Sequence, residues 1–313
     1  MSLSGIKTVF MGTPVFALPT LKALVEANAD IVAVVTQPDR PKGRGRTISP
    51  PPVKEFALEK GLRLFQPQKV REREFIKVLE NIAPDLIVVV AFGQILPADL
   101  LNIPKIGCVN VHASLLPAYR GAAPINWAIV NGEVETGITT MLMDEGLDTG
   151  DMLLVEKVAI GPEDDSELLY GRLAETGGPL LVRTLEGLKD GTVMAVRQDD
   201  AAATYAPIIK KEDGIIDWSA EAAQIVNLVR GMRPWPTAQT RLDARGFKVL
   251  KSRAAGGSGA PGEVLKVGKD FFEVAAGSGS VEIYELQLEG KKAMKTADFL
   301  MGYKLKGGEM LGT

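Results

Sequence analysis

The stretch Leu86–Val90, LIVVV, decides the fold class of this chain of 313 residues. It is apolar at every position, whereas a strand with one solvent-exposed face alternates apolar and polar residues. A continuous apolar strand is expected inside a parallel sheet that helices cover on both faces. The stretch therefore predicts an α/β fold.

Short apolar runs and helix-like segments alternate around this strand through the first half of the chain. The expected strands and helices are Ile6–Met11, Phe16–Ala27 (helix), Ile31–Thr36, Leu62–Phe65, Glu72–Glu80 (helix), Gly107–Val111 and Ser166–Leu188 (helix). This alternation predicts an open, mostly parallel, Rossmann-like sheet.

The second half has a different pattern. A helix is expected from Ser219 to about Arg230, with Ser219 as its N-cap. Short, turn-bounded runs suited to strands follow at Thr237–Leu242, Phe247–Arg253, Gly262–Val267, Phe271–Ala275 and Val281–Gln287. Five such strands predict a small OB-like β-barrel. We therefore expect a first domain over residues 1–189, a linker over 190–206 and a barrel domain over 207–313.

Composition excludes several classes of protein. Hydrophobic residues at 46% and charged residues at 24% are ordinary for a soluble globular chain. The first apolar run is too short for a secretory signal, and no run is long enough to span a bilayer. The single cysteine, Cys108, fits a reducing compartment. We expect a cytoplasmic monomer, since no long apolar heptad is visible.

Charge is distributed unevenly along the chain. Residues 1–206 carry 20 basic and 26 acidic side chains, a net charge of −6, and residues 207–313 carry 16 and 13, a net charge of +3. The excess of basic residues in the second half hints at an acidic partner, and an ordinary solvated surface is the alternative.

The only histidine, His112, lies two residues after Asn110 at the end of an expected strand. That spacing places both on the same side of the sheet, at the carboxyl end where open α/β sheets bind ligands. An amide that stabilises an oxyanion and an imidazole that moves a proton suit acyl transfer. For a lone histidine a structural role is the alternative, which the position and the amide partner make weaker.

A carboxylate that orients this histidine is expected in the acidic segment that follows. Its candidates are Asp144, Glu145, Asp148 and Asp151. Their spacing does not fit a calcium-binding loop, and a zinc site would need mostly carboxylates in a chain with one histidine and one cysteine. We therefore expect no metal.

A basic segment between Gln37 and Lys54 is rich in proline and glycine, which predicts an exposed loop. Its basic residues are Arg40, Lys42, Arg44 and Arg46. Taken alone, such a segment is more often a solvated surface than a nucleic-acid contact.

Several segments together resemble the folate-dependent formyltransferases. They are NVHASLLPAYRGAAPI from Asn110, ETGITTMLMDEGLDTGD from Glu135, FMGTPVFALPTLKAL from Phe10, VVTQPDRPKGRGR from Val34, VVVAFGQILP from Val88, DW at Asp217 and RPWP at Arg233. The resemblance covers nearly the whole chain, and the combination is far more specific than any one motif.

The resemblance implies a catalytic trio of Asn110, His112 and Asp148. In it Asn110 holds the formyl oxygen, His112 acts in proton transfer, and Asp148 orients His112 and helps to pass protons. The implied folate contacts are Ser114, Leu115, Leu116 and Pro117, with Phe92, Gln94, Ile95 and Leu96 as a wall for the pterin. Plain core packing is the alternative for the leucines.

The branch of the family that matches best transfers a formyl group from 10-formyltetrahydrofolate to the α-amino group of initiator methionyl-tRNA, for translation initiation, without a metal. The basic segment then corresponds to a loop that approaches the tRNA, with Arg44 as its key arginine, and Lys248 and Lys251 are candidates for a second RNA contact. Related enzymes that act on glycinamide ribonucleotide or on an amino-sugar nucleotide are the alternative.

Two other classes of protein fit less well. A nicotinamide-dependent oxidoreductase is suggested by Gly12 after the first strand, but no G-x-G-x-x-G motif follows it. A non-catalytic RNA-binding module would leave His112 as a surface contact.

Overall fold

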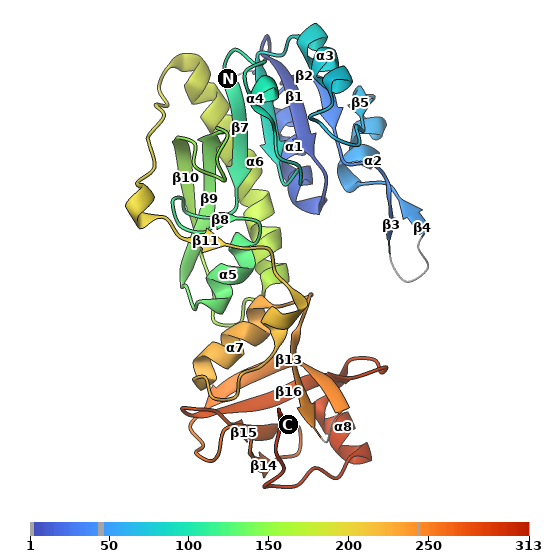
Figure 1. Ribbon diagram of the computed structural model, residues 1–313, viewed down its shortest axis with the longest axis vertical. Helices are drawn as coiled ribbons and strands as arrows, with labels where there is room; N and C mark the ends of the chain where they lie inside the picture. The colour runs from blue at the N-terminus through green and yellow to red at the C-terminus, as the bar shows by residue number, and fades with distance from the viewer. Residues whose placement is uncertain (1–2, 43–46, 243–244, 313) are drawn as a thin grey trace. The chain divides into compact units, whose positions relative to one another are not determined.

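The computed structural model describes residues 3–42, 47–242 and 245–312 and divides into two compact units (Figure 1). The first unit comprises Met1–Gly121, Thr136–Ala159 and Tyr170–Tyr205. The second comprises Ala122–Glu135, Ile160–Leu169 and Ala206–Thr313. The units interleave along the chain, because two short segments of the first half pack with the residues after Tyr205.

A seven-stranded sheet forms the centre of the first unit, in the order β10-β9-β7-β6-β1-β2-β5. Its strands are β1 (Lys7–Gly12), β2 (Asp30–Val35), β5 (Leu64–Phe65), β6 (Leu86–Val90), β7 (Gly107–His112), β9 (Glu135–Leu142) and β10 (Met152–Ala159). Strands β5, β2, β1, β6 and β7 are parallel to their neighbours in turn, whereas β9 is antiparallel to β7. The predicted mostly parallel sheet is confirmed.

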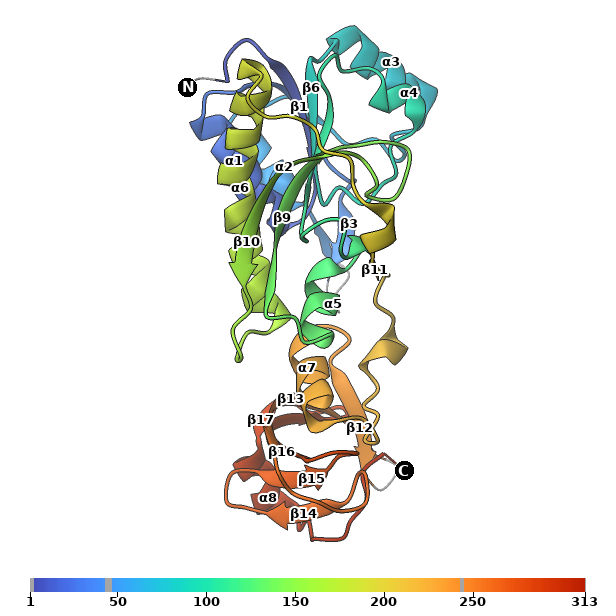
Figure 2. The same ribbon diagram turned by 90° about the vertical axis from the view of Figure 1, so that its left-hand side faces the viewer.

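Helices cover both faces of this sheet, with α1 and α6 on one face and α3 and α4 on the other (Figure 2). The helices and short strands that complete this part of the chain are η1 (Val15–Ala17), α1 (Leu18–Glu26), β3 (Arg40–Lys42), β4 (Thr47–Ser49), α2 (Pro52–Glu59), α3 (Arg73–Ile82), α4 (Ala98–Leu101), β8 (Arg120–Gly121), α6 (Ser166–Asp190), η2 (Asp200–Ala202) and β11 (Tyr205–Ala206). All of β6 is buried, as expected of a strand that is apolar on both faces.

The second unit contains an antiparallel sheet in the order β12-β13-β16-β15-β14, with β17 also paired to β16. Its elements are α5 (Pro124–Val130), η3 (Lys211–Gly214), α7 (Ala222–Gly231), β12 (Ala238–Leu242), β13 (Arg245–Ala255), β14 (Val264–Val267), β15 (Phe272–Ala275), β16 (Ser280–Leu288), β17 (Met294–Lys295) and α8 (Thr296–Gly302). Near the C-terminus, Met310 pairs with Glu263 and Leu311 with Leu242, which links the two edges of the sheet.

Helix α7 begins three residues later than the sequence predicted. Glu221 is its N-cap, and the backbone N–H of Glu221 donates to the side chain of Gln224 at 3.1 Å. Ser219 instead donates its hydroxyl to Asp217 at 2.6 Å. Ser219 was therefore wrong as the N-cap, because its hydroxyl is used in a local turn before the helix.

The segment over residues 190–206 lies in the first unit as far as Tyr205. Val196 pairs with Met152 at the start of β10, and the Gln198 side chain is only 4% exposed. Among the described residues, no helix is long and apolar enough to cross a membrane.

Candidate active site

Strand β7 carries Asn110 and ends at His112. Asn110 lies beside Val89 of β6, and His112 lies beside Thr139 of β9. His112 is buried, with 6% of its side chain exposed, and Asn110 is half-buried. Because side chains alternate along a strand, both residues lie on the same face of the sheet at the carboxyl end of β7.

Each of the two nitrogens of the His112 ring lies near a different group. Nε2 lies 3.0 Å from the carbonyl oxygen of Tyr119, and since a carbonyl only accepts, this contact assigns a proton to Nε2. Nδ1 lies 3.7 Å from Oδ2 of Asp148. Nδ1 is therefore the ring nitrogen that faces the carboxylate and is placed to exchange a proton during the reaction.

Of the four acidic candidates, Asp148 is the one that forms an ion pair with His112. Asp144 accepts instead from the Thr149 hydroxyl at 2.7 Å and from the backbone N–H of Gly146 at 3.0 Å. These hydrogen bonds engage the Asp144 carboxylate within its own turn. The geometry thus separates residues that spacing alone left equivalent.

The backbone around Asp148 is held in an uncommon conformation. Its φ is +53°, in the left-handed region that costs a non-glycine residue about 1 kcal/mol. The backbone N–H of Gly121 donates to Asp148 Oδ2 at 2.8 Å and fixes the carboxylate. Two residues on, a Cβ at Gly150 would lie 1.8 Å from the carbonyl oxygen of Leu142, so only glycine fits there.

Sequence reasoning missed the backbone contribution of Tyr119 and Gly121. Both have positive φ, +61° and +125°, which turns the chain so that one carbonyl meets His112 and one N–H meets Asp148. Backbone groups exist at every residue, so side-chain chemistry could not reveal this. Gly121 was the one available signal, because glycine adopts this conformation readily.

The Ser114–Pro117 loop is bonded closely to the neighbouring structure. Ser114, fully buried, donates its hydroxyl to the carbonyl of Ala118 at 2.6 Å. Thr139 links the loop to β9, since its hydroxyl donates to Ser114 O at 2.7 Å and accepts from Leu116 N at 3.1 Å. Leu116 is buried, whereas Leu115 and Pro117 are half-buried.

The predicted pterin wall divides into buried and exposed residues. Phe92 and Leu96 belong to the apolar core of the first unit. Gln94 accepts from the backbone N–H of Val70 at 2.9 Å, which ties this segment to its neighbour. Ile95 is 88% exposed and is the apolar side chain that this segment presents to solvent.

The basic segment forms a short hairpin of β3 and β4 at its ends, and Arg44 and Arg46 lie outside the described residues. Lys42 is the last residue of β3. Arg40 is exposed and donates to the side chain of Gln37 at 3.2 Å. The exposed-loop expectation therefore needs one correction, since backbone pairing between β3 and β4 gives its ends strand structure.

Asp39 fixes the base of this hairpin. It pairs with Lys54 at 2.7 Å and accepts from the side chain of Gln66 at 2.9 Å. These hydrogen bonds lower the pKa of Asp39 below its ordinary value.

Lys248 and Lys251 both lie on β13 of the second unit. Lys248 is half-buried and lies beside Gln287, whereas Lys251 is exposed and lies beside Glu285. A register shift between Val249 and Lys251 interrupts the alternation of the strand.

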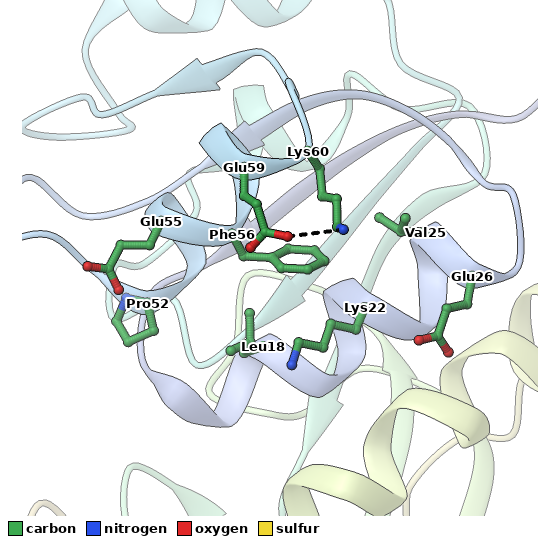
Figure 3. A pocket seen from close by; sticks show the side chains of 9 residues that line it. All are labelled: Leu18, Lys22, Val25, Glu26, Pro52, Glu55, Phe56, Glu59 and Lys60. Atoms are coloured by element: carbon green, nitrogen blue, oxygen red, sulfur yellow. Dashed lines mark ion pairs between the residues drawn. The ribbon is translucent and has the colours of Figure 1, made fainter.

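No predicted site residue lines the surface hollow between α1 and α2 (Figure 3). In this hollow the ring of Phe56 lies 5.9 Å from the Lys22 ammonium and 5.5 Å from that of Lys60. Among the described residues, no group of three or more His, Cys, Asp or Glu side chains could hold a metal ion. Cys108 is buried, which raises the pKa of its thiol to about 12.

Comparison with known proteins places this geometry in a family. Residues 6–185 match the family described as formyl transferase, and residues 208–304 match the formyl transferase C-terminal domain. The chain belongs to the formyl transferase family. A methionyl-tRNA formyltransferase of Citrifermentans bemidjiense is 57% identical to it over 310 residues, which cover 99% of this chain and 98% of that protein.

Solved structures share the formyl transferase fold at low sequence identity. An N-formyltransferase from Helicobacter canadensis, in complex with folinic acid and dTDP-3-aminofucose, is 18% identical with a TM-score of 0.66 and covers 89% of this chain and 98% of that one. HypX from Aquifex aeolicus, in complex with tetrahydrofolic acid, is 17% identical with a TM-score of 0.64 and covers 98% of this chain and 49% of that one. These likenesses concern the fold alone.

Proposed function

We propose that this formyl transferase transfers the formyl group of 10-formyltetrahydrofolate to the α-amino group of initiator methionyl-tRNA. The observation that carries the proposal is His112, which lies at the end of β7 with Asp148 opposite its Nδ1. The name of the relative that is 57% identical over nearly the full chain supports the acceptor. The tetrahydrofolic acid complex of HypX supports a folate donor.

The reaction joins the amine nitrogen to the formyl carbon and breaks the bond between that carbon and N10 of the folate. The amine loses one proton, and N10 gains one. Asn110 donates its amide N–H to the formyl oxygen as negative charge develops there, an interaction worth about 10²- to 10³-fold in rate. His112 Nδ1 and the Asp148 carboxylate manage the proton, a contribution of about 10²- to 10⁴-fold.

Folate contacts are proposed for the two loops beside this trio. Ile95, which is exposed, and Leu115 and Pro117, which are half-buried, supply apolar surface. Ser114 and Leu116 hold their loop in place through hydrogen bonds with Ala118 and Thr139. Phe92, Gln94 and Leu96 anchor the other loop through the core and the segment near Val70.

Contacts with the tRNA are proposed for basic residues in both units. Those of the first are Arg40, Lys42, Arg44 and Arg46, and those of the second are Lys248 and Lys251. Such contacts with phosphates add affinity and salt dependence but little sequence information. In functional terms, residues 1–189 would carry the transfer chemistry, 190–206 would connect, and 207–313 would hold RNA.

The test is formylation of charged initiator tRNA by the purified chain with 10-formyltetrahydrofolate. Elongator methionyl-tRNA and an amino-sugar nucleotide serve as control acceptors in parallel reactions. We expect formylation of initiator methionyl-tRNA at a kcat/KM well above that of either control. Faster formylation of the amino-sugar nucleotide, or formylation of neither tRNA, would overturn the proposed acceptor.

A further inference from the structure

Arg120 is the largest fully buried side chain among the described residues, with 2% of its surface exposed. Its Nε donates to the side-chain oxygen of Gln198 at 3.0 Å, and its Nη2 donates to the Asp200 carboxylate at 2.9 Å. The Asp200 side chain is 66% exposed. A guanidinium is costly to bury, so a buried one with so exposed a counter-ion calls for a reason other than a strong ion pair.

Gln198 connects this arginine to the turn that contains Asp148. Its side-chain N–H groups donate to the backbone carbonyls of Asp148 at 2.8 Å and of Gly150 at 2.7 Å. Both donors of the amide are therefore used on the two ends of one turn, while its oxygen accepts from Arg120. The hydrogen bond to Arg120 also fixes which side of the amide faces the turn.

Arg120 acts on the same site through its chain neighbours. The carbonyl of Tyr119 meets His112 Nε2, and the N–H of Gly121 meets Asp148 Oδ2. Hydrogen bonds and the chain thus connect His112 through Tyr119, Arg120 and Gln198 to Asp148, and the 3.7 Å contact between Asp148 and His112 Nδ1 closes the ring. Within this ring neither His112 nor the Asp148 turn can move without breaking a buried hydrogen bond.

Gln198 is not needed to attach its own segment to the unit. Thr204 does so a few residues on, since its carbonyl accepts from Arg120 N at 2.9 Å and its hydroxyl accepts from Tyr119 N at 2.8 Å. Val196 is attached on the other side by two backbone hydrogen bonds of 2.8 Å to Met152. The contacts of Gln198 with Asp148 and Gly150 therefore have a separate consequence, which is the placement of the turn.

We propose that Gln198 and Arg120 are positioning residues that fix the carboxylate of Asp148 opposite Nδ1 of His112. The proposal rests on the proposed formyl transfer, because the readout is that reaction. It predicts that loosening the turn lowers the rate of the chemical step and leaves substrate binding nearly unchanged. A displacement of about 1 Å at such a site costs up to about 10²-fold in rate.

The decisive variant is Gln198→Glu, which keeps an acceptor for Arg120 but replaces the N–H donors with an oxygen beside the two carbonyls. We expect kcat to fall by about 10- to 100-fold, with KM for both substrates within about threefold of wild type. Gln239→Glu is the matched control, since Gln239 also donates to a backbone carbonyl, that of Lys211 at 3.0 Å, and contacts no part of the His112 ring. It should retain wild-type kcat.

A double-mutant cycle separates positioning from general damage to the fold. In an Asp148→Ala background, Gln198→Glu should change the single-turnover rate by less than about twofold, because the group it positions is gone. An undiminished further loss there, or a wild-type kcat in the single variant, would overturn the proposal. If Gln198→Glu does not fold, Gln198→Met removes the same donors without adding charge and is judged by the same criteria.

Hydrogen exchange tests, independently of the reaction, whether the Gln198 hydrogen bonds hold the turn that contains Asp148. In the free protein, backbone amides over residues 144–151 should exchange at least about tenfold faster in Gln198→Glu than in wild type, while Tm stays close to that of Gln239→Glu. Unchanged exchange would contradict a role of Gln198 in holding this turn. A wild-type protein that formylates no acceptor would instead refute the proposed function. The exchange result would still show whether Gln198 holds the turn.

Discussion

Two arginine–glutamine pairs in the first unit have similar lengths but very different surroundings. Arg120 donates to Gln198 at 3.0 Å in the interior, and Arg40 donates to Gln37 at 3.2 Å from the exposed base of the β3–β4 hairpin. Arg120 is 2% exposed, whereas Arg40 is exposed. Burial strengthens a hydrogen bond and raises the cost of breaking it, so the first pair can fix a geometry. The second leaves a guanidinium accessible to phosphate.

This contrast matches the two roles proposed for these regions, formyl transfer near His112 and tRNA binding at the hairpin. The groups around His112 are fixed by buried or partly buried hydrogen bonds with Tyr119, Gly121 and Gln198. Arg40 lies exposed at the base of the hairpin, which is held by Asp39 and Lys54. Substitutions near His112 should therefore change kcat, and substitutions in the hairpin should change tRNA affinity.

The largest effect is expected for His112→Ala. Loss of the imidazole removes proton transfer and should lower kcat by about 10²- to 10⁴-fold. Binding of methionyl-tRNA, measured by filter binding, should stay within about twofold of wild type, because phosphate contacts supply most of the affinity. Formyl transfer at the wild-type rate would show that His112 takes no part in the reaction, and it would contradict the difference proposed between the two regions.

A smaller loss, about 10²-fold in kcat, is expected for Gly150→Ala. The added Cβ would meet the Leu142 carbonyl at 1.8 Å and displace the turn that carries Asp148. Gly171→Ala in α6 is the matched control, since no atom lies within 4 Å of its added Cβ, and it should keep full activity. Equal kcat values for the two variants would show that the turn tolerates displacement.

In the hairpin, Arg40→Ala should raise KM for tRNA by a few-fold and leave kcat unchanged. Loss of one phosphate contact lowers the slope of log affinity against log salt by about 1, and Arg44→Ala should do the same. Arg183→Ala on α6 is the control, because Arg183 is an exposed arginine that pairs with Glu156. A loss that appeared only in folate KM, with the salt slope unaltered, would refute the tRNA contact.

The smallest effect concerns pH and the base of the hairpin. Because hydrogen bonds lower the pKa of Asp39, its ionised form stabilises the fold above the ordinary value of 3.8, and this contribution is lost as pH falls through the lowered pKa. Urea midpoints of wild type and Asp39→Asn should therefore differ at pH 6 and begin to converge only below about pH 4, as the pH falls through the lowered pKa of Asp39. A difference between the two urea midpoints that grew as the pH fell would contradict the lowered pKa of Asp39.

Periodicity and burial explain why much of the fold could be predicted from the sequence. The LIVVV run of β6 is buried throughout, because a parallel strand between helix layers needs apolar residues on both faces. The N-cap of α7 was misplaced, since Ser219 suits a helix start but its hydroxyl bonds to Asp217 in a turn before the helix. Short elements such as α4 and α5 have too few residues to show a period.

The placement of the candidate side chains could be predicted from the sequence, but the hydrogen bonds that support them could not. The placement of Asn110 and His112 on one face at the end of β7 follows from strand alternation. The burial of Gln198 was not predicted, since an amide in a polar segment that the sequence predicted as a linker has no pattern that marks it as buried. Its role depends on hydrogen bonds to residues about 50 and 80 positions away, which local sequence does not encode.

The most direct test of the account is the position of the proton on its one histidine. A tag-free protein labelled with ¹⁵N-histidine contains a single imidazole, so its two ring-nitrogen signals belong to His112. The Tyr119 carbonyl contact predicts that neutral His112 carries its proton on Nε2, with Nδ1 bare toward Asp148. A proton on Nδ1 and a bare Nε2 in the neutral ring would contradict the arrangement from which the proton transfer is derived.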